Sequence, residues 1–280
     1  MSGQVASGTA AGPITTSEPL ATREGLGRPR VSACILSLDE ADRIEECLRS
    51  VDWCDEILVV DSHSKDATRE IAASLGARVI ERDWPGFGPQ REFAIRNASN
   101  DWIFLIDCDE RVSPELRASI LGVRDAGFPA RAGWKCARLA HYLGRWIRHG
   151  VWYPNRQLRL FDRRRARVAG HEPHDRVELD SPPGLLRGDL LHFPYRSLDE
   201  HLRTIERYTA IMARDLHRRG RRASVLDLAL RPPARFAKSY FLRLGLLDGW
   251  RGLLVAALAA HYVRMKYAKL FVLQDVRDPP

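Results

Sequence analysis

Residues 102–110 read WIFLIDCDE, and the interpretation of the whole chain starts from this stretch. The apolar run predicts a strand over Trp102–Asp107 that is buried on both faces, because a half-exposed strand would alternate apolar and polar residues. Asp107 ends the run, and a second aspartate follows at Asp109. The stretch therefore predicts an interior strand that carries two carboxylates to the edge of a sheet.

Short apolar runs alternate with segments of helical period upstream of this strand. Strands are expected over Val31–Ser37, Glu56–Asp61 and Arg78–Glu81, and helices over Asp39–Val51, Ala67–Leu75 and Glu92–Ser99. This alternation is typical of an α/β fold with a mainly parallel sheet covered on both faces. Ligands bind beyond the carboxyl ends of such strands, so Asp61 and Asp107, which both end a strand, are expected at one rim.

The composition divides the chain into three parts. Residues 1–28 are rich in Ser, Thr, Gly, Ala and Pro without periodicity, which is typical of a disordered tail. Residues 29–195 contain the alternating pattern, followed by β-structure and loops after about residue 133. Residues 196–280 are predicted to form a helical extension.

The helical extension combines apolar residues with positive charge. A helix is expected from Ser197 to about Arg219, and a second helical region over 225–274, interrupted at Pro232-Pro233 and near 245–252. Eight Arg or Lys residues lie between positions 231 and 270, among Phe, Tyr, Trp and Leu. Basic amphipathic helices of this kind lie on anionic membrane surfaces. The alternative is a helical cap that packs on the rest of the chain or on another subunit.

The bulk properties narrow the partners and the location. A formal net charge of +8 fits nucleic acid, an anionic membrane or phosphorylated substrates. No motif of a nucleic-acid-binding module is present, so no nucleic-acid partner is expected. The longest apolar run, Leu253–Ala260, is shorter than the ~20 residues that a membrane span needs. With no signal-peptide pattern and no CxxC pair, we expect reduced thiols and a cytoplasmic protein, peripheral to the inner face of the cytoplasmic membrane.

The Asp107-Cys108-Asp109 segment suits a divalent cation bound to phosphates. Such a cation takes one or two protein carboxylates, and its other ligands come from phosphate and water. Two aspartates at i and i+2 beyond a strand can act on one ligand, one at the sugar or ribose and one at the metal. The alternative is a solvated acidic turn, and the buried strand before it together with Asp61 on the same rim disfavours that alternative.

Four blocks of sequence, in order, carry a resemblance to a known family. They are ACILSLDEADRIEECLRSV from residue 33, EILVVDSHSKDATREIA from 56, GFGPQREFAI from 86 and DWIFLIDCDERVSPEL from 101. Together they resemble the family-2 inverting glycosyltransferases of GT-A fold, closest to the branch that adds sugars to lipopolysaccharide core. The resemblance covers roughly residues 30–195. It implies a nucleotide-sugar donor such as UDP-glucose, Mg²⁺ or Mn²⁺, a lipid-linked glycan acceptor and inversion at the anomeric carbon.

The resemblance also assigns roles to individual residues. Donor contacts are implied at Asp39, Glu40, Asp61, Gln90, Arg91 and Asp107, with Gln90 and Arg91 in a loop near the donor. Asp107 and Asp109 form the DxD pair, and Asp109 is the better metal ligand. The family's first strand commonly ends in Thr-x-Asn-Glu, whereas this chain has Ser37-Leu-Asp39-Glu40. A charge therefore replaces an amide at one expected nucleotide contact.

An inverting transferase needs one general base, because a single displacement requires a deprotonated acceptor hydroxyl. Residues 170–177 read GHEPHDRV and offer Glu172 and Asp175. A His-Glu or His-Asp dipeptide occupies this place in the resembling branch, so Asp175 is the predicted base and Glu172 the alternative. The segment lacks the i, i+4 histidine pair of a zinc-binding helix, so zinc is not expected.

The stretch NRQLRLF at residues 155–161 resembles the family's strand before the base loop. Arg156 or Arg159 could neutralise the departing pyrophosphate, as fixed cations do at a leaving group.

Two other functions are open. A nucleotidyltransferase would normally carry a Gly-rich phosphate loop after the first strand, which Ser37-Leu-Asp-Glu40 is not. A catalytically inactive membrane-associated nucleotide-sugar-binding protein is disfavoured by the presence of Asp61, Asp107, Asp109 and Asp175.

Overall fold

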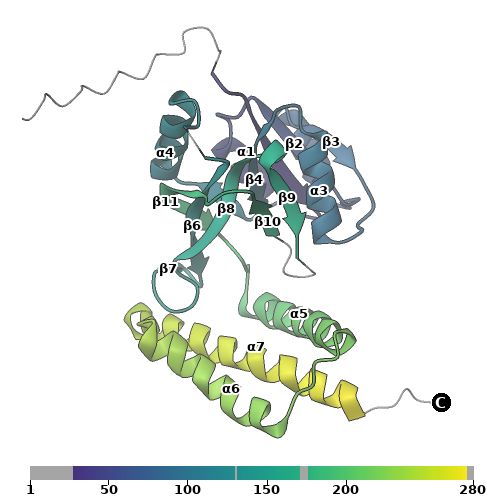
Figure 1. The fold of residues 1–280 in the computed structure, drawn as a ribbon, viewed down its shortest axis with the longest axis vertical. Coiled ribbons are helices and arrows are strands. Elements are labelled where there is room, and N and C mark those ends of the chain that lie inside the picture. The colour runs from purple at the N-terminus through teal and green to yellow at the C-terminus, as the bar shows by residue number, and fades with distance from the viewer. Residues whose placement is uncertain (1–27, 130, 171–175, 276–280) are drawn as a thin grey trace, which may run out of the picture.

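The computed structural model describes residues 28–129, 131–170 and 176–275, which form a sheet-based domain above a layer of helices (Figure 1). The strands are β1 (Val31–Ser37), β2 (Glu56–Asp61), β3 (Arg78–Glu81), β4 (Trp102–Asp107), β5 (Glu110–Val112), β6 (Gly133–Tyr142), β7 (Arg145–Ile147), β8 (Asn155–Asp162), β9 (Ala166–Ala169), β10 (Arg176–Leu179) and β11 (Gly184–His192). The helices are α1 (Ile44–Ser50), α2 (Thr68–Ser74), α3 (Phe87–Asn97), α4 (Pro114–Asp125), α5 (Leu198–Arg218), α6 (Val225–Ala237) and α7 (Gly249–Asp275). Residues 1–27 of the predicted tail lie outside the described residues.

The main sheet is mixed, with strand order β3-β2-β1-β4-β8-β6-β11-β5 and β7 attached to β6. The first four strands in this order are parallel, as predicted, and their register aligns Ser37 with Asp61 and Leu36 with Asp107. β8 runs antiparallel to both β4 and β6, whereas β11 is parallel to β6. The predicted mainly parallel sheet with a C-terminal helical extension is confirmed, and β9 and β10 form a separate hairpin.

Both faces of the sheet are covered, which explains why the strands are apolar without alternation. Ala33 and Ile35 face a cluster that includes residues of α1, α2 and α4. Cys34, between them in β1, faces the other cluster, against α3 and the β9–β10 hairpin. Each fully buried Ile or Leu side chain stabilises the fold by about 1.5–3 kcal/mol relative to an exposed one. All five cysteines are free thiols, as predicted. Four of them are buried and Cys54 is half-buried.

Two helices differ from prediction at their N-termini. α1 begins at Ile44 rather than Asp39, because Asp39 adopts a left-handed φ of 54° and the loop after β1 is held by residues of the β2–α2 loop. α3 begins at Phe87 rather than near Glu92. Gln90 and Arg91 therefore lie on a helix, and their placement in a loop was wrong.

The C-terminal helices correct a second prediction. α6 continues through Pro232 and Pro233, although each proline removes a main-chain donor, because the helix packs along α7. The predicted break near 245–252 lies a few residues earlier, as a π-helical turn over Lys238–Leu242 and a 3₁₀ turn over Gly245–Asp248, and α7 begins at Gly249. This turn is tight, since a Cβ at Gly252 would lie 1.8 Å from the Gly245 carbonyl oxygen.

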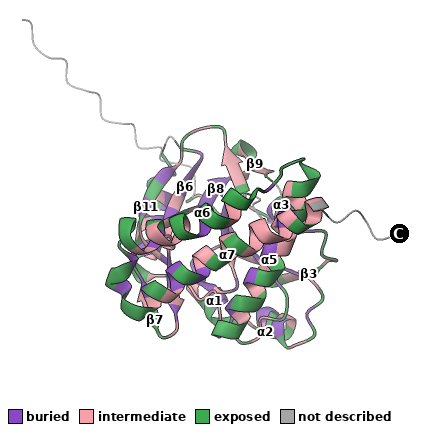
Figure 2. Cartoon of the chain, turned by 90° about the horizontal axis from the view of Figure 1, so that it is seen from below, coloured by how far each residue is buried: buried purple, intermediate pink, exposed green. Residues whose placement is uncertain are grey.

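The helical layer is fixed to the sheet domain by polar contacts at several points. Tyr142 Oη at the end of β6 lies 2.9 Å from His201 Nδ1 of α5. Asp248 accepts hydrogen bonds from the His149 N–H at 2.9 Å, and Arg251 Nε donates to the Leu143 carbonyl at 2.7 Å. Seen from below, α5, α6 and α7 cover the underside of the molecule and carry many exposed residues (Figure 2).

Candidate active site

The candidate site lies where β1, β2 and β4 end. Because these strands are parallel and in register, Ser37, Asp61 and Asp107 reach the same rim, as predicted. Asp61 is completely buried there. It accepts hydrogen bonds from Ser37 Oγ at 2.7 Å, from the Ser64 N–H at 2.8 Å and from Ser64 Oγ at 2.5 Å. In this structure Asp61 therefore ties the end of β1 to the β2–α2 loop.

Asp39 and Glu40 form the loop after β1. The Asp39 N–H donates to Ser64 Oγ at 2.9 Å, and Asp39 Oδ1 accepts from the Lys65 N–H at 2.7 Å. The side chain of Asp39 is exposed at the rim. The Asp39 carboxylate, which stands where the resembling family has an amide, therefore holds the loop after β2 through one of its oxygens.

Glu40 connects this loop to the segment before α5. Its Oε2 accepts a hydrogen bond from Arg196 Nη2 at 3.0 Å. Burial raises the pKa of Glu40, the guanidiniums of Arg43 and Arg196 oppose this rise, and the negative charge of Asp109 adds to it.

Asp107 is held by arginines. Arg159 Nη2 donates to its Oδ2 at 2.8 Å, and Arg91 Nη2 lies 3.9 Å from its Oδ1. Burial opposes ionisation, but the guanidiniums of Arg159 and Arg91 outweigh it and hold the pKa of Asp107 well below its usual range. Asp107 is therefore ionised at neutral pH and fixed in orientation.

Asp109 differs from Asp107 in its partner. Its Oδ2 lies 3.2 Å from Nε2 of His192, the last residue of β11, and the two side chains are 24% and 13% exposed. The Asp109 carbonyl also accepts a hydrogen bond from the Phe193 N–H at 2.8 Å. A carboxylate and an imidazole side by side are both metal-ligand types. No group of three or more His, Cys, Asp or Glu in the described part of the chain could by itself hold a metal ion.

Glu110, which had no assigned role in the sequence, sits under the DxD pair. It is fully buried, accepts the Asp107 N–H at 3.1 Å, and forms an ion pair with Arg159. Arg138 Nη1 approaches it at 3.4 Å. Burial raises the pKa of Glu110, and the charge of Arg159 opposes that rise. One buried guanidinium thus joins two carboxylates, which fixes the start of the β4–β5 turn.

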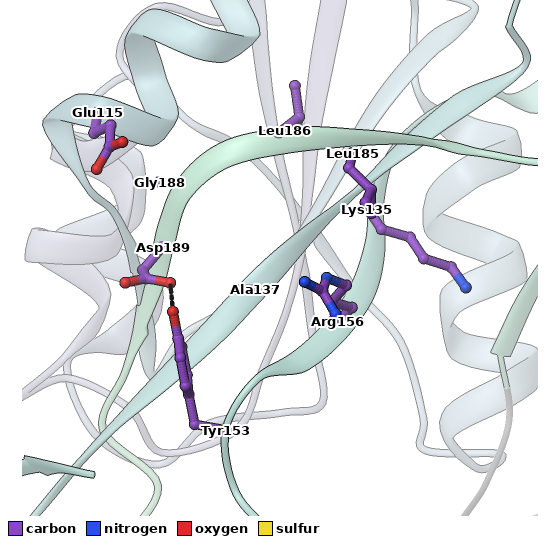
Figure 3. A pocket seen from close by; sticks show the side chains of 9 residues that line it. All are labelled: Glu115, Lys135, Ala137, Tyr153, Arg156, Leu185, Leu186, Gly188 and Asp189. Atoms are coloured by element: carbon purple, nitrogen blue, oxygen red, sulfur yellow. Dashed lines mark hydrogen bonds between the residues drawn. The ribbon is translucent and has the colours of Figure 1, made fainter. Parts of the chain in front are cut away.

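Gln90 and Arg156 lie in different surroundings. Gln90 is fully buried on α3, and its Nε2 donates to Ser62 Oγ at 3.2 Å, while its Oε1 has no hydrogen-bond partner. Arg156 and Lys135 line a pocket formed mainly by β6, β8 and β11 (Figure 3). In the same pocket, Tyr153 Oη donates a hydrogen bond to Asp189 Oδ1 at 3.1 Å. Only Arg159 of the two predicted arginines contacts the DxD segment.

The two candidate bases, Glu172 and Asp175, lie outside the described residues. The described chain resumes at Arg176, which pairs with Ala169 in the β9–β10 hairpin. The hairpin packs on the same sheet face as α3, the helix that carries Arg91.

Comparisons with known proteins agree with this architecture. The sequence model of "Glycosyl transferase family 2" matches residues 32–129. The lipopolysaccharide core biosynthesis glycosyltransferase LpsC of Rhizobium meliloti is 31% identical over 89% of this chain and 95% of its own length. An uncharacterized glycosyltransferase of Rickettsia bellii is 30% identical over 90% of this chain and 96% of its own length.

A solved structure, glucosyl-3-phosphoglycerate synthase from Mycobacterium tuberculosis, is 27% identical with a TM-score of 0.34 and covers 39% of this chain and 44% of that one. This match spans less than half of either chain, so the assignment rests on the sequence relatives. Three observations point to the same family. They are the alternation of strands and helices, the Asp107-Cys108-Asp109 turn at the end of β4, and the relatives that match over most of their length. The chain is a GT-A glycosyltransferase and belongs to glycosyl transferase family 2.

Proposed function

We propose that the enzyme transfers a sugar from a nucleotide-diphosphate donor, with UDP-glucose as the first candidate, to a lipid-linked glycan of the lipopolysaccharide-core type. Family membership supports the transfer chemistry, and the name of the Rhizobium meliloti relative supports the acceptor class. The reaction is a single displacement, in which the acceptor hydroxyl attacks the anomeric carbon and the nucleoside diphosphate leaves. Such a reaction inverts the anomeric configuration.

The observation that carries this proposal is the arrangement around the DxD turn. Asp109 and His192 present a carboxylate oxygen and an imidazole nitrogen 3.2 Å apart at a partly exposed position, which fits a Mg²⁺ or Mn²⁺ ion. The diphosphate and water would supply the remaining ligands. When bound, the ion neutralises charge on the leaving diphosphate. Asp107 fits the metal less well, because one of its oxygens already accepts from Arg159.

The other residues of the site orient the donor. Asp107, ionised and fixed by Arg159, accepts a hydrogen bond from a hydroxyl of the ribose or the sugar in this proposal. Asp39 and Glu40 border the nucleotide side of the rim, where the charge of Arg196 reduces repulsion between Glu40 and the diphosphate. Arg91 supplies a positive charge next to Asp107 from the first turns of α3.

The acceptor hydroxyl needs a base, and we assign this role to Asp175, with Glu172 as the alternative. Asp175 directly precedes Arg176, the first residue of β10. A carboxylate there would take the proton of the acceptor hydroxyl as the bond to the anomeric carbon forms.

The acceptor class implies work at a membrane surface. No helix among the described residues is long and apolar enough to cross a bilayer. We therefore propose peripheral association with the inner face of the cytoplasmic membrane, through the basic helical layer formed by α5, α6 and α7.

Donor hydrolysis and transfer, measured with a panel of nucleotide sugars with and without Mn²⁺, test the proposal. We expect metal-dependent release of UDP from one donor, strongly reduced in Asp109→Asn. Asp125→Asn, an exposed aspartate at the end of α4, is the matched control and should behave as wild type. Metal-dependent donor binding without any turnover would instead favour an inactive nucleotide-sugar-binding protein.

A further inference from the structure

Large apolar side chains are exposed in the first turns of α6 and in the turn that follows the helix. Leu226 and Leu230, one helical turn apart, are 66% and 61% exposed. Beyond the helix, in the π-helical turn over Lys238–Leu242, Phe241 and Leu242 are 55% and 78% exposed. A monomeric soluble protein rarely leaves this many large apolar side chains of one segment in water. The surface therefore requires a partner.

The turn between α6 and α7 extends this surface. Leu247 and Trp250 are each 58% exposed. The turn is rigid, because the close approach of Gly252 to Gly245 leaves no room for a Cβ. Asp248, buried beneath the turn, is bound by the N–H and the imidazole of His149. The apolar side chains are thus held outward by a fixed backbone. We call residues 226–250 on this side the α6 surface.

The charge around the α6 surface is strongly positive. Residues 221–253 contain seven Arg or Lys and two acidic residues. Both acidic residues are engaged, Asp227 with Arg231 and Asp248 with His149. Lys238 and Arg243 are exposed between the apolar side chains. The combination of outward apolar groups and unbalanced cations is complementary to a surface that is anionic outside and apolar beneath.

We propose that the α6 surface binds an anionic lipid bilayer. The apolar side chains of α6 and the following turn enter the boundary between headgroups and acyl chains. Lys238 and Arg243 contact lipid phosphates, with their aliphatic stems along the apolar layer. Each cation near an anionic leaflet strengthens the binding, and each apolar side chain adds to this as it leaves water. This assignment places the contact on one face of α6 and its turn, rather than on the whole basic extension.

The inferred contact also orients the active site. β11 is parallel to β6 and ends at His192, from which the chain leads into α5 of the helical layer. Arg196, between His192 and α5, contacts Glu40 of the rim, so the rim that carries Asp109 lies on the side of the sheet domain that leads into the helical layer. With the α6 surface on the bilayer, this rim points toward the membrane. The inference rests on the proposed function, because it narrows the proposed membrane association to one surface and assumes a lipid-linked acceptor for the orientation of the rim.

Vesicle flotation of the full chain, without donor or acceptor, tests the membrane contact. Vesicles of phosphatidylcholine alone are compared with vesicles that also contain phosphatidylglycerol. Wild type is expected to float with the anionic vesicles. The double variant Leu242→Asp, Leu247→Asp is expected to bind them at least about tenfold more weakly. The matched control is Leu185→Asp, which changes a 62% exposed leucine of β11 and should bind as wild type. Equal melting temperatures of the three proteins exclude unfolding as the cause.

Two outcomes would overturn the inference. One is unchanged binding of the double variant to anionic vesicles. The other is a wild-type dimer that ignores vesicles and becomes monomeric in the double variant, which would make the α6 surface a contact between copies. Failure of the proposed function has a different signature, because vesicle binding would persist while no nucleotide sugar is turned over.

Discussion

Asp109 Oδ2 and His192 Nε2 lie 3.2 Å apart, although one residue follows β4 and the other ends β11. The antiparallel pairing of β5 with β11, which sets His192 opposite Glu110, brings them together. The pair joins the half of the sheet that binds the donor in our proposal to the half that leads into the helical layer.

His192→Ala is expected to weaken donor binding in the presence of Mn²⁺ by roughly tenfold to a hundredfold, with little effect in its absence. The reason is the loss of one metal ligand while the metal-free contacts remain. Calorimetric titration with UDP-glucose, with and without Mn²⁺, measures both. The control is His217→Ala, a histidine of the last turn of α5 away from the rim. Equal loss of affinity with and without the metal would refute a ligand role for His192.

Arg159→Leu should destabilise the fold by about 3–5 kcal/mol, because one buried and one partly exposed carboxylate lose their shared guanidinium. Those carboxylates are Asp107 and Glu110. Urea unfolding of the variant measures the loss. Adding Glu110→Gln to Arg159→Leu removes one uncompensated charge and should restore part of the stability. If the double variant is no more stable than the single one, the network does not work as described.

His201 should make stability depend on pH. Burial lowers its pKa from 6.5 to about 4, so the unfolded state binds a proton more readily than the folded state. The contribution of the neutral His201 imidazole to the free energy of unfolding is complete above pH 6.5 and is lost as the pH falls toward about 4. The His201 ring stacks on Tyr195 with centroids 4.1 Å apart, and His201→Phe keeps an aromatic ring there but cannot titrate. Its unfolding free energy should vary less than that of wild type across this range, and parallel curves would contradict the assignment.

Asp175→Asn should leave donor affinity unchanged and lower kcat by at least about a hundredfold, since the base would be lost while the donor site stays intact. Glu172→Gln serves as the matched comparison and should retain turnover. Transfer assays at saturating donor measure both. The reverse pattern would move the base to Glu172.

Local patterns were sufficient for the parallel strands β1 to β4 but not for the rest of the sheet or for the polar network. The strand bounds of β1 to β4 follow from apolar runs bounded by polar residues, and these bounds were predicted correctly. The start of α1 depends on contacts between Asp39 and Ser64, which no local pattern contains. The partners of Asp109 and Asp107, His192 and Arg159, depend on strand register across the sheet.

The prolines of α6 show the opposite limitation. Pro232 and Pro233 predict a helix break from local chemistry, and the packing of α6 along α7 overrides it. The exposed apolar face of α6 could be noticed only after α6 and α7 were placed, because Leu and Arg are mixed along both segments.

The most direct test of the central claim is a calorimetric comparison of wild type with Asp109→Asn, titrated with UDP-glucose in the presence and absence of Mn²⁺. Our account predicts that Mn²⁺ strengthens binding to wild type at least about tenfold and leaves the variant unchanged. Equal strengthening by Mn²⁺ in both proteins would contradict it.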